Sequence, residues 1–190
     1  KVVAHREVLP LGVFGKQIAI HSKKGELPNL KGVSFALLGI KENRNDVNYM
    51  GAEVNFDELR KSLYGLFPGN WTKKVVDLGD IEKGEATADS FFAFTAVTSA
   101  LLKKDIIPII FGGSQDLLYP HYRSYDVLEQ MVNIVNVDHR FDLGNADHPI
   151  SNKSYVGKII LDRPYNLFNY SVLGYQSYFS NKKLRIKLSI

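Results

Sequence analysis

The sequence predicts an α/β protein, built as a three-layer α/β/α arrangement around a mostly parallel sheet. Two observations favour this class. Apolar runs of strand length alternate with segments of helical spacing along most of the chain. Two of these runs, residues 33–40 and 106–111, are almost continuously apolar and have a glycine at or just after the end, which is typical of strands buried on both faces. Strands that alternate with helices of this length are joined as parallel neighbours.

Each expected element follows from a local pattern. Strands are expected at residues 17–21 (a short edge strand), 33–40, 74–78, 106–111, 132–138, 156–161, 171–175 and 184–190, and helices at residues 55–67, 88–104 and 119–130. The first helix has Asn55 as its predicted cap and Glu58 three residues later, in the pattern of a capping box. Residues 1–32 contain two prolines and several glycines and are expected to be irregular. We expect residues 1–190 to form a single domain.

The composition restricts the kinds of site and partner. The 190 residues are 45% hydrophobic and 23% charged, which is the mix of a folded domain. There is no cysteine, so a metal site would need oxygen and nitrogen ligands. The net charge of +4 comes mostly from scattered lysine pairs, so nucleic-acid binding is not expected. No apolar stretch is long enough for a membrane span and no signal-peptide pattern is found, so we expect a cytoplasmic protein without a membrane partner.

The predicted strand at 106–111 ends where ligands of such sheets bind, at the carboxyl edge. Gly112 and Gly113 follow it and let the backbone turn sharply and approach a neighbour closely. A double glycine after a strand is common, so this feature alone does not define a site.

The predicted strand at 132–138 ends in a cluster of charged residues. Asp138, Arg140 and Asp142 would share one face if the extended conformation continued, with His139 pointing away. Two carboxylates at a strand end are consistent with a hard-cation site. A structural Asp–Arg–Asp salt-bridge cluster is the alternative, and these residues alone favour it.

Together, the two strand ends resemble the motifs of the ureohydrolase family, which includes arginase, agmatinase and formiminoglutamase. Ureohydrolases carry Gly-Gly-Asp-His after one strand and Asp-Ala-His-x-Asp after the next. This chain has Gly-Gly-Ser-Gln at 112–115 and Asp-His-Arg-Phe-Asp at 138–142, in the same order. The run 107–113 is the most specific match, and residues 167–178 resemble the formiminoglutamase branch. The similarity extends over residues 33–178.

The resemblance implies an arginase-like fold and a centre of two divalent ions, usually manganese. A water between the ions would attack the carbon of a small guanidino or amidine substrate. Position by position, the histidine ligand of the first motif falls on Gln115. The aspartates of the second motif fall on Asp138 and Asp142, which would hold the metals and the catalytic water, and its histidine falls on Arg140. The resemblance also implies a homo-oligomer.

Two departures predict that the metal site is degenerate. Arg140 stays protonated and has no lone pair for a metal, and we expect its guanidinium to pair with both Asp138 and Asp142 in place of a cation. The Asp-x-Asp motif that completes the metal pair in the family is not found between Asp142 and Ile190, so the family's C-terminal part is missing from this sequence.

The expected function is therefore that of an arginase-, agmatinase- or formiminoglutamase-like protein with weak or no hydrolysis of the C–N bonds of linear amidines. The alternative is an active manganese-dependent amidine hydrolase that uses substitute ligands.

Four further residues have two open interpretations each, and a fifth has one. His139 is a substitute ligand if the strand end is bulged, and otherwise packs against a helix. His148 follows in a loop that contacts substrate in the family, and a solvated turn is the ordinary alternative. Glu42 and Arg44 fall where relatives line the rim of the site, although charged loop residues are usually solvated. Asp77 is expected to lie in an ordinary turn.

Overall fold

The computed structural model describes residues 2–22, 25–70, 72–145 and 147–179. Its elements are, in chain order, α1 (Val2–Val8), α2 (Phe14–Gln17), β1 (Ala19–Ile20), β2 (Phe35–Ile40), α3 (Asp57–Tyr64), β3 (Val75–Ile81), α4 (Thr87–Leu102), β4 (Ile107–Phe111), η1 (Gln115–Leu117), α5 (Leu118–Arg123), η2 (Ser124–Leu128), β5 (Val132–Val137), α6 (Tyr155–Leu161), β6 (Leu167–Leu173) and η3 (Ser177–Phe179). The predicted strand at 184–190 lies outside the described residues. Within the described residues, no helix is both long and apolar enough to cross a membrane.

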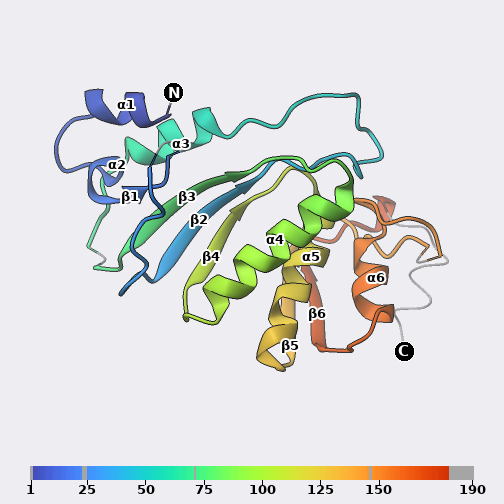
Figure 1. The fold of residues 1–190 in the computed structure, drawn as a ribbon. Helices are drawn as coiled ribbons and strands as arrows, with labels where there is room; N and C mark the ends of the chain where they lie inside the picture. Colours follow the sequence, from blue (N-terminus) through green and yellow to red (C-terminus); the bar gives the residue numbers. More distant parts are fainter. Residues whose placement is uncertain (1, 23–24, 71, 146, 180–190) are drawn as a thin grey trace.

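The strands form two sheets, and every described strand pair is parallel. The first sheet has the order β1-β3-β2-β4, and the second contains β5 and β6 (Figure 1). β1 lies at an edge of the first sheet, as predicted. Parallel neighbours require crossover connections, which α3, α4 and α6 supply within the sheets, while α5 lies between β4 of the first sheet and β5 of the second. The predicted α/β class is confirmed.

Helices cover both faces of the first sheet (Figure 1). Alternate residues of a strand point to opposite faces, so Leu37 packs on one side with Phe14 of α2 and Tyr64 of α3. Its neighbour Leu38 packs on the other side with Phe94 of α4. Because residues of both parities are buried, the central strands are apolar at successive positions, which is the pattern that predicted three layers.

Helix α6 occupies the segment 156–161, which was predicted to be a strand. Tyr155 and Ile159, four residues apart, are buried in one cluster with Tyr122 of α5 and Ile134 of β5. This burial follows helical spacing. A short segment rich in apolar and β-branched residues fits a strand or a helix equally well, and here packing against α5 decides the outcome.

Two local predictions in the N-terminal part are also wrong. Residues 1–32, expected to be irregular apart from the edge strand, contain the helices α1 and α2. The capping box at Asn55 does not form, because Phe56 is the N-cap residue of α3 and makes no side-chain cap bond. Asn55 Oδ1 instead accepts a hydrogen bond from the backbone nitrogen of Asp57 at 2.8 Å.

A buried ion pair between Arg60 and Asp77 holds α3 against β3. Asp77 lies in β3 and not in the ordinary turn that was expected. The side chain of Asp77 is fully buried. Arg60 Nε and the hydroxyl of Tyr64 both donate to Asp77 Oδ2, at 2.8 and 2.6 Å. Arg60 Nη1 also lies 2.6 Å from Asp80 Oδ1. Burial, together with the charge of Asp77, raises the pKa of Tyr64, so the phenol stays protonated and donates.

We predict that Arg60→Met destabilises the protein by about 3–5 kcal/mol, because it leaves the buried carboxylate of Asp77 without its cation. The free energy of unfolding in urea measures the loss. Lys61→Met is the matched control on the same helix, and the loss of its exposed pair with Glu58 should leave the free energy of unfolding almost unchanged. Equal effects of the two substitutions would show that the buried pair does not hold α3 on the sheet.

Candidate functional site

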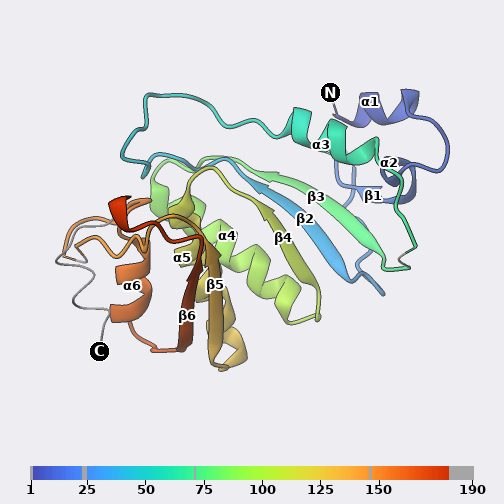
Figure 2. The same ribbon diagram turned by 180° about the vertical axis from the view of Figure 1, so that it is seen from behind.

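The loops that follow β2, β4 and β5 meet at the carboxyl edge of the strands (Figure 2). Side-chain hydrogen bonds join them: Asn45 to Asp116, and Gln115 to Asp138. The two strand ends that the sequence indicated are therefore in contact, and a third loop, which the sequence did not indicate strongly, lies against the first of them.

The glycine pair allows the close approach of the first two loops. A Cβ atom on Gly113 would fall on the backbone carbonyl of Glu42. Any other residue would force the two backbones apart. The chain then enters the short 3-10 helix η1, which begins at Gln115 and presents its amide to the end of β5.

Three internal donors surround the carboxylate of Asp138, which is only 9% exposed. Gln115 Nε2 donates to Asp138 Oδ2 at 2.6 Å. The other oxygen, Oδ1, accepts the backbone N–H of Arg140 at 3.2 Å and lies 3.0 Å from His139 Nδ1. Both oxygens are thus engaged by the protein itself.

Arg140 does not bridge the two aspartates, and that expectation is wrong. Its Nε donates to His139 Nε2 at 2.7 Å, and its guanidinium carbon lies 5.9 Å from the centre of the Phe179 ring. Among the described residues, no ion pair joins Arg140 to Asp138 or Asp142. Because His139 Nε2 accepts from Arg140, the imidazole proton resides on Nδ1 and is donated to Asp138.

The side chains of residues 138–142 do not alternate between two faces as predicted, because the strand before them stops earlier than expected. β5 ends at Val137, residues 138–140 form a bend, and Asp142 has a left-handed φ of 45°. His139 therefore turns toward Asp138 instead of away from it. The edge of the His139 ring meets Phe179, with centroids 4.7 Å apart, so the segment after β6 packs over the bend.

Asp142 lies near these groups in a partly buried position. Burial, and then the negative charge of Asp138, raise its pKa to about 6, against the opposing charges of Arg140 and His139. The carboxyl group therefore takes up a proton more readily than an ordinary aspartate.

These residues do not fit a two-metal centre. Gln115 directs its amide nitrogen, not its carbonyl oxygen, toward Asp138. Asp138 already accepts three donors, and Arg140 has no lone pair. The described part of the chain contains no cluster of three or more His, Cys, Asp or Glu residues placed to bind a metal ion. His148 is exposed, and its backbone nitrogen donates to the carbonyl of Asn145.

A second polar cluster centres on Glu42, which is fully buried although a solvated role was expected. Arg44 donates to both carboxylate oxygens of Glu42, from Nε to Oε1 at 3.0 Å and from Nη2 to Oε2 at 2.6 Å. Ser90 Oγ also donates to Oε2, at 2.7 Å. Burial alone would raise the pKa of Glu42, but the hydrogen bonds from Arg44 and Ser90 lower it to about 2. Arg44 also donates to the carbonyls of Gly84 and Glu85, so it joins the loop after β2 to the loop between β3 and α4.

The same loop after β2 reaches the second half of the structure. Asn45 donates to the buried Asp116 at 2.9 Å, and Ser114 also donates to that carboxylate. Burial raises the pKa of Asp116. Asn152, in the loop before α6, donates to Asp46 at 2.9 Å.

Sequence reasoning missed Asn45, Asp116, Asn152 and Phe179 as parts of this arrangement. Their partners are distant in the sequence: Asn45 and Asp116 lie 71 positions apart, Asn152 and Asp46 lie 106 apart, and Phe179 lies 40 residues after His139. A run of polar residues directly after a buried strand is the signal that singles out residues 42–46, and no local pattern marks Phe179.

We predict that Glu42→Gln removes about 3 kcal/mol of stability at pH 7, corresponding to the shift of its pKa from 4.5 to about 2. A lowered carboxyl pKa stabilises the folded state above pH 4.5, and this contribution is lost as the pH falls toward 2. Between pH 5 and 3.5, the wild type should lose about 1 kcal/mol that the variant does not lose.

Urea unfolding at the two pH values measures this difference. Glu82→Gln is the control, because Glu82 is exposed and pairs only with Lys41 at the surface. Identical pH dependence in wild type and Glu42→Gln would contradict the assignment of Glu42 as a buried, ionised carboxylate.

No family model matches the chain. Two curated relatives are similar to it: the formimidoylglutamase of Lysinibacillus sphaericus is 27% identical over 154 residues, covering 77% of this chain and 45% of that protein. The formimidoylglutamase of Ralstonia nicotianae is 26% identical over 156 residues, covering 77% and 46%. The chain thus spans about half the length of the curated relatives it matches.

Solved structures agree in fold. The Trypanosoma cruzi formiminoglutamase solved with Mn²⁺ has a TM-score of 0.67 at 16% identity, covering 79% of this chain and 55% of that one. The formimidoylglutamase of Bacillus subtilis has a TM-score of 0.68 at 17% identity, covering 89% and 55%.

Structural neighbours with an arginase-type fold and curated formimidoylglutamase relatives both match the region that carries the two strand-end motifs. The resemblance to the ureohydrolase family inferred from those motifs is confirmed by the curated relatives, and the arginase-like fold by the solved structures.

Proposed function

We propose that this protein keeps the ureohydrolase architecture while an internal hydrogen-bond network replaces the two-metal centre, so that it hydrolyses linear amidines or guanidines weakly or not at all. The observation that supports this proposal most directly is the saturation of Asp138. Its two oxygens accept from Gln115 and Arg140 and lie beside a histidine N–H.

The cost of displacing this network opposes metal binding. An ion at Asp138 would have to displace a charge-assisted hydrogen bond of 2.6 Å from Gln115. It would also have to separate His139 from Arg140, whose fixed positive charge repels a cation. Each donor released in this buried position would need a new partner.

The alternative is a manganese-dependent hydrolase that uses substitute ligands. It is favoured by the persistence of Asp138 and Asp142 at family ligand positions and by the imidazole of His139 beside them. For His139 to bind a metal, one ring nitrogen would have to give up either Asp138 or Arg140. A site that binds no metal keeps both hydrogen-bond partners of His139 and needs no such rearrangement.

We predict that the purified protein retains no manganese after incubation with excess Mn²⁺ and desalting, as measured by elemental analysis. Gln115→His combined with Arg140→His should gain metal, because it supplies two imidazoles and removes the cation. Arg163→His adds a histidine at an exposed distant position and is the matched control, which should remain metal-free. Retention of about two ions per chain by the wild type would instead support the active enzyme.

We also predict no release of urea or formamide above the background rate from arginine, agmatine or formiminoglutamate. The assay is run on the wild type in the presence of Mn²⁺ and again after chelation. A rate that depends on Mn²⁺ and is lost on Asp138→Asn would overturn the proposal. Unchanged thermal unfolding after chelation is the independent result that a network without metal requires.

A further inference from the structure

Helix α4 lies on one face of the first sheet but is too narrow to cover all four strands (Figure 1). Neighbouring strands lie about 4.8 Å apart, and a helix with its side chains is about 10 Å wide. The loop between β1 and β2 covers part of the remaining face and leaves a groove of about 350 Å³ beside α4. The described lining residues are His21, Leu27, Pro28, Leu30, Leu38, Leu78, Asp80, Ile81, Val97, Ala100, Leu101 and Lys104.

The floor of this groove is part of the hydrophobic core. Leu38 and Leu101 line it and are each only 2% exposed. Leu78 of β3 and Val97 of α4 pack against both core clusters under the helix, one around Val76 and the other around Phe94. Core packing therefore sets the shape of the apolar floor.

A lysine without a partner stands at the end of the apolar wall. Val97, Ala100 and Leu101 share one side of α4 by their helical spacing, and Lys104 follows three residues after Leu101, just beyond the end of the helix. No carboxylate of the described residues pairs with the exposed Lys104.

The charge of the acidic lining residue is already compensated. The carboxylate of Asp80 lies 2.6 Å from Arg60 Nη1 and 3.7 Å from Lys41 Nζ. The imidazole of His21 adds a second polar group, with its Nδ1 3.5 Å from the carbonyl oxygen of Glu26. Lys104 is therefore the charged lining group that can take an anion.

The surface around the groove is also basic. Three more exposed lysines adjoin lining residues or one another: Lys31, Lys74 and Lys103. The ammonium of Lys74 donates to the backbone carbonyl of Lys31 at 3.1 Å, which holds these two lysines together. Glu26 and Asp105 are the acidic residues next to lining residues in the sequence, so the local balance is positive and attracts anions.

We propose that this groove binds an amphiphilic monocarboxylate, a fatty acid of medium chain length. Its alkyl chain lies along Leu38, Val97 and Leu101, and its carboxylate pairs with Lys104. Binding pockets range from about 300 to 1,000 Å³, so this volume suits one small ligand and not a lipid with two chains. A neutral alcohol of the same length leaves Lys104 without a partner.

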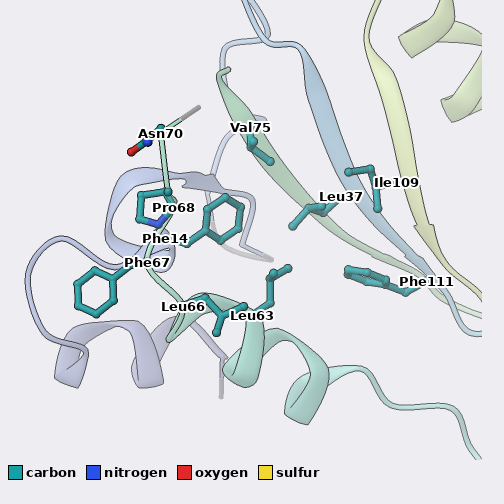
Figure 3. A pocket seen from close by; sticks show the side chains of 11 residues that line it. Phe14, Leu37, Leu63, Leu66, Phe67, Pro68, Asn70, Val75, Ile109 and Phe111 are labelled. Atoms are coloured by element: carbon teal, nitrogen blue, oxygen red, sulfur yellow. The ribbon is translucent and has the colours of Figure 1, made fainter. Parts of the chain in front are cut away.

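A second apolar hollow provides an internal comparison. It lies on the opposite face, between Phe14, Phe67 and Phe111, and its volume is about 610 Å³ (Figure 3). None of its described lining residues is charged. An alkyl chain would bury apolar surface there without forming an ion pair, so the dependence of binding on ligand charge distinguishes the two places.

Isothermal titration calorimetry of the full 190-residue chain at neutral pH, below the critical micelle concentration, tests the proposal. Hexanoate, octanoate and decanoate should bind with affinities that rise about tenfold for each added pair of methylene groups. Decanoate should bind about threefold more tightly than decanol, because its carboxylate pairs with Lys104.

Two variants with matched controls locate the site. Lys104→Met should lower the affinity for decanoate to that for decanol, while Lys103→Met, which changes the exposed neighbour outside the lining, should leave the preference for decanoate in place. Ala100→Trp should fill the groove and weaken decanoate binding at least tenfold. Ala96→Trp, also exposed on α4 but outside the lining, should bind as the wild type does. Circular dichroism and thermal unfolding establish that each variant is folded.

Three results contradict the proposal. The first is no binding of decanoate by the folded wild type, including the case in which the protein associates only with vesicles of an anionic phospholipid. The second is equal affinity for decanoate and decanol. The third is binding that Ala100→Trp leaves unchanged in a folded variant, which assigns the ligand to another apolar surface such as the hollow of Figure 3. None of these results depends on metal content, so the proposed function stands or falls separately.

Discussion

The buried carboxylate of Glu42 is the constraint on which the arrangement of the site depends. A charge in that position is tolerable only if it is paired and hydrogen-bonded, and Arg44 and Ser90 provide both. Pairing with Arg44 fixes the path of the loop after β2. That path brings Asn45 to Asp116 and thereby holds the start of η1, from which Gln115 reaches the end of β5. The position of Gln115 thus follows from a charge that takes no direct part in the site.

Asp138 poses the same physical problem and meets it in the same way. A nearly buried aspartate needs either a cation or several donors. Here the amide of Gln115, the backbone of Arg140 and the imidazole of His139 provide donors, and Arg140 orients the imidazole from its other side. The positive charge of Arg140 thus acts on Asp138 through His139. A direct Arg140–carboxylate pair is not needed, which explains why the bridging geometry expected from the sequence does not occur.

The parallel sheet, and both strand ends that carry the motifs, could be predicted because continuous apolar runs have a distinct pattern. The helix α6 could not be predicted, because the apolar residues of this short segment fit the spacing of a strand as well as that of a helix, and contact with α5 selects the helix. The burial of Asp77 was missed because its partner Arg60 lies on another element, and local sequence does not show such a pair. The orientation of His139 depends on where β5 stops, and element ends are the least certain feature of a sequence-based prediction.

The residues that still match the family's motifs are therefore not, by themselves, evidence that catalysis is retained. Gly113 is required by packing, because a side chain there would collide with the backbone of Glu42 whether or not a metal is bound nearby. Asp138 is required as the acceptor at the centre of its network, since Gln115 and His139 would otherwise lose their partner. Asp142 differs from both, because burial next to the carboxylate of Asp138 raises its pKa. Of the residues that match the family's motifs, Asp142 is thus the one whose ionised form the surrounding structure opposes.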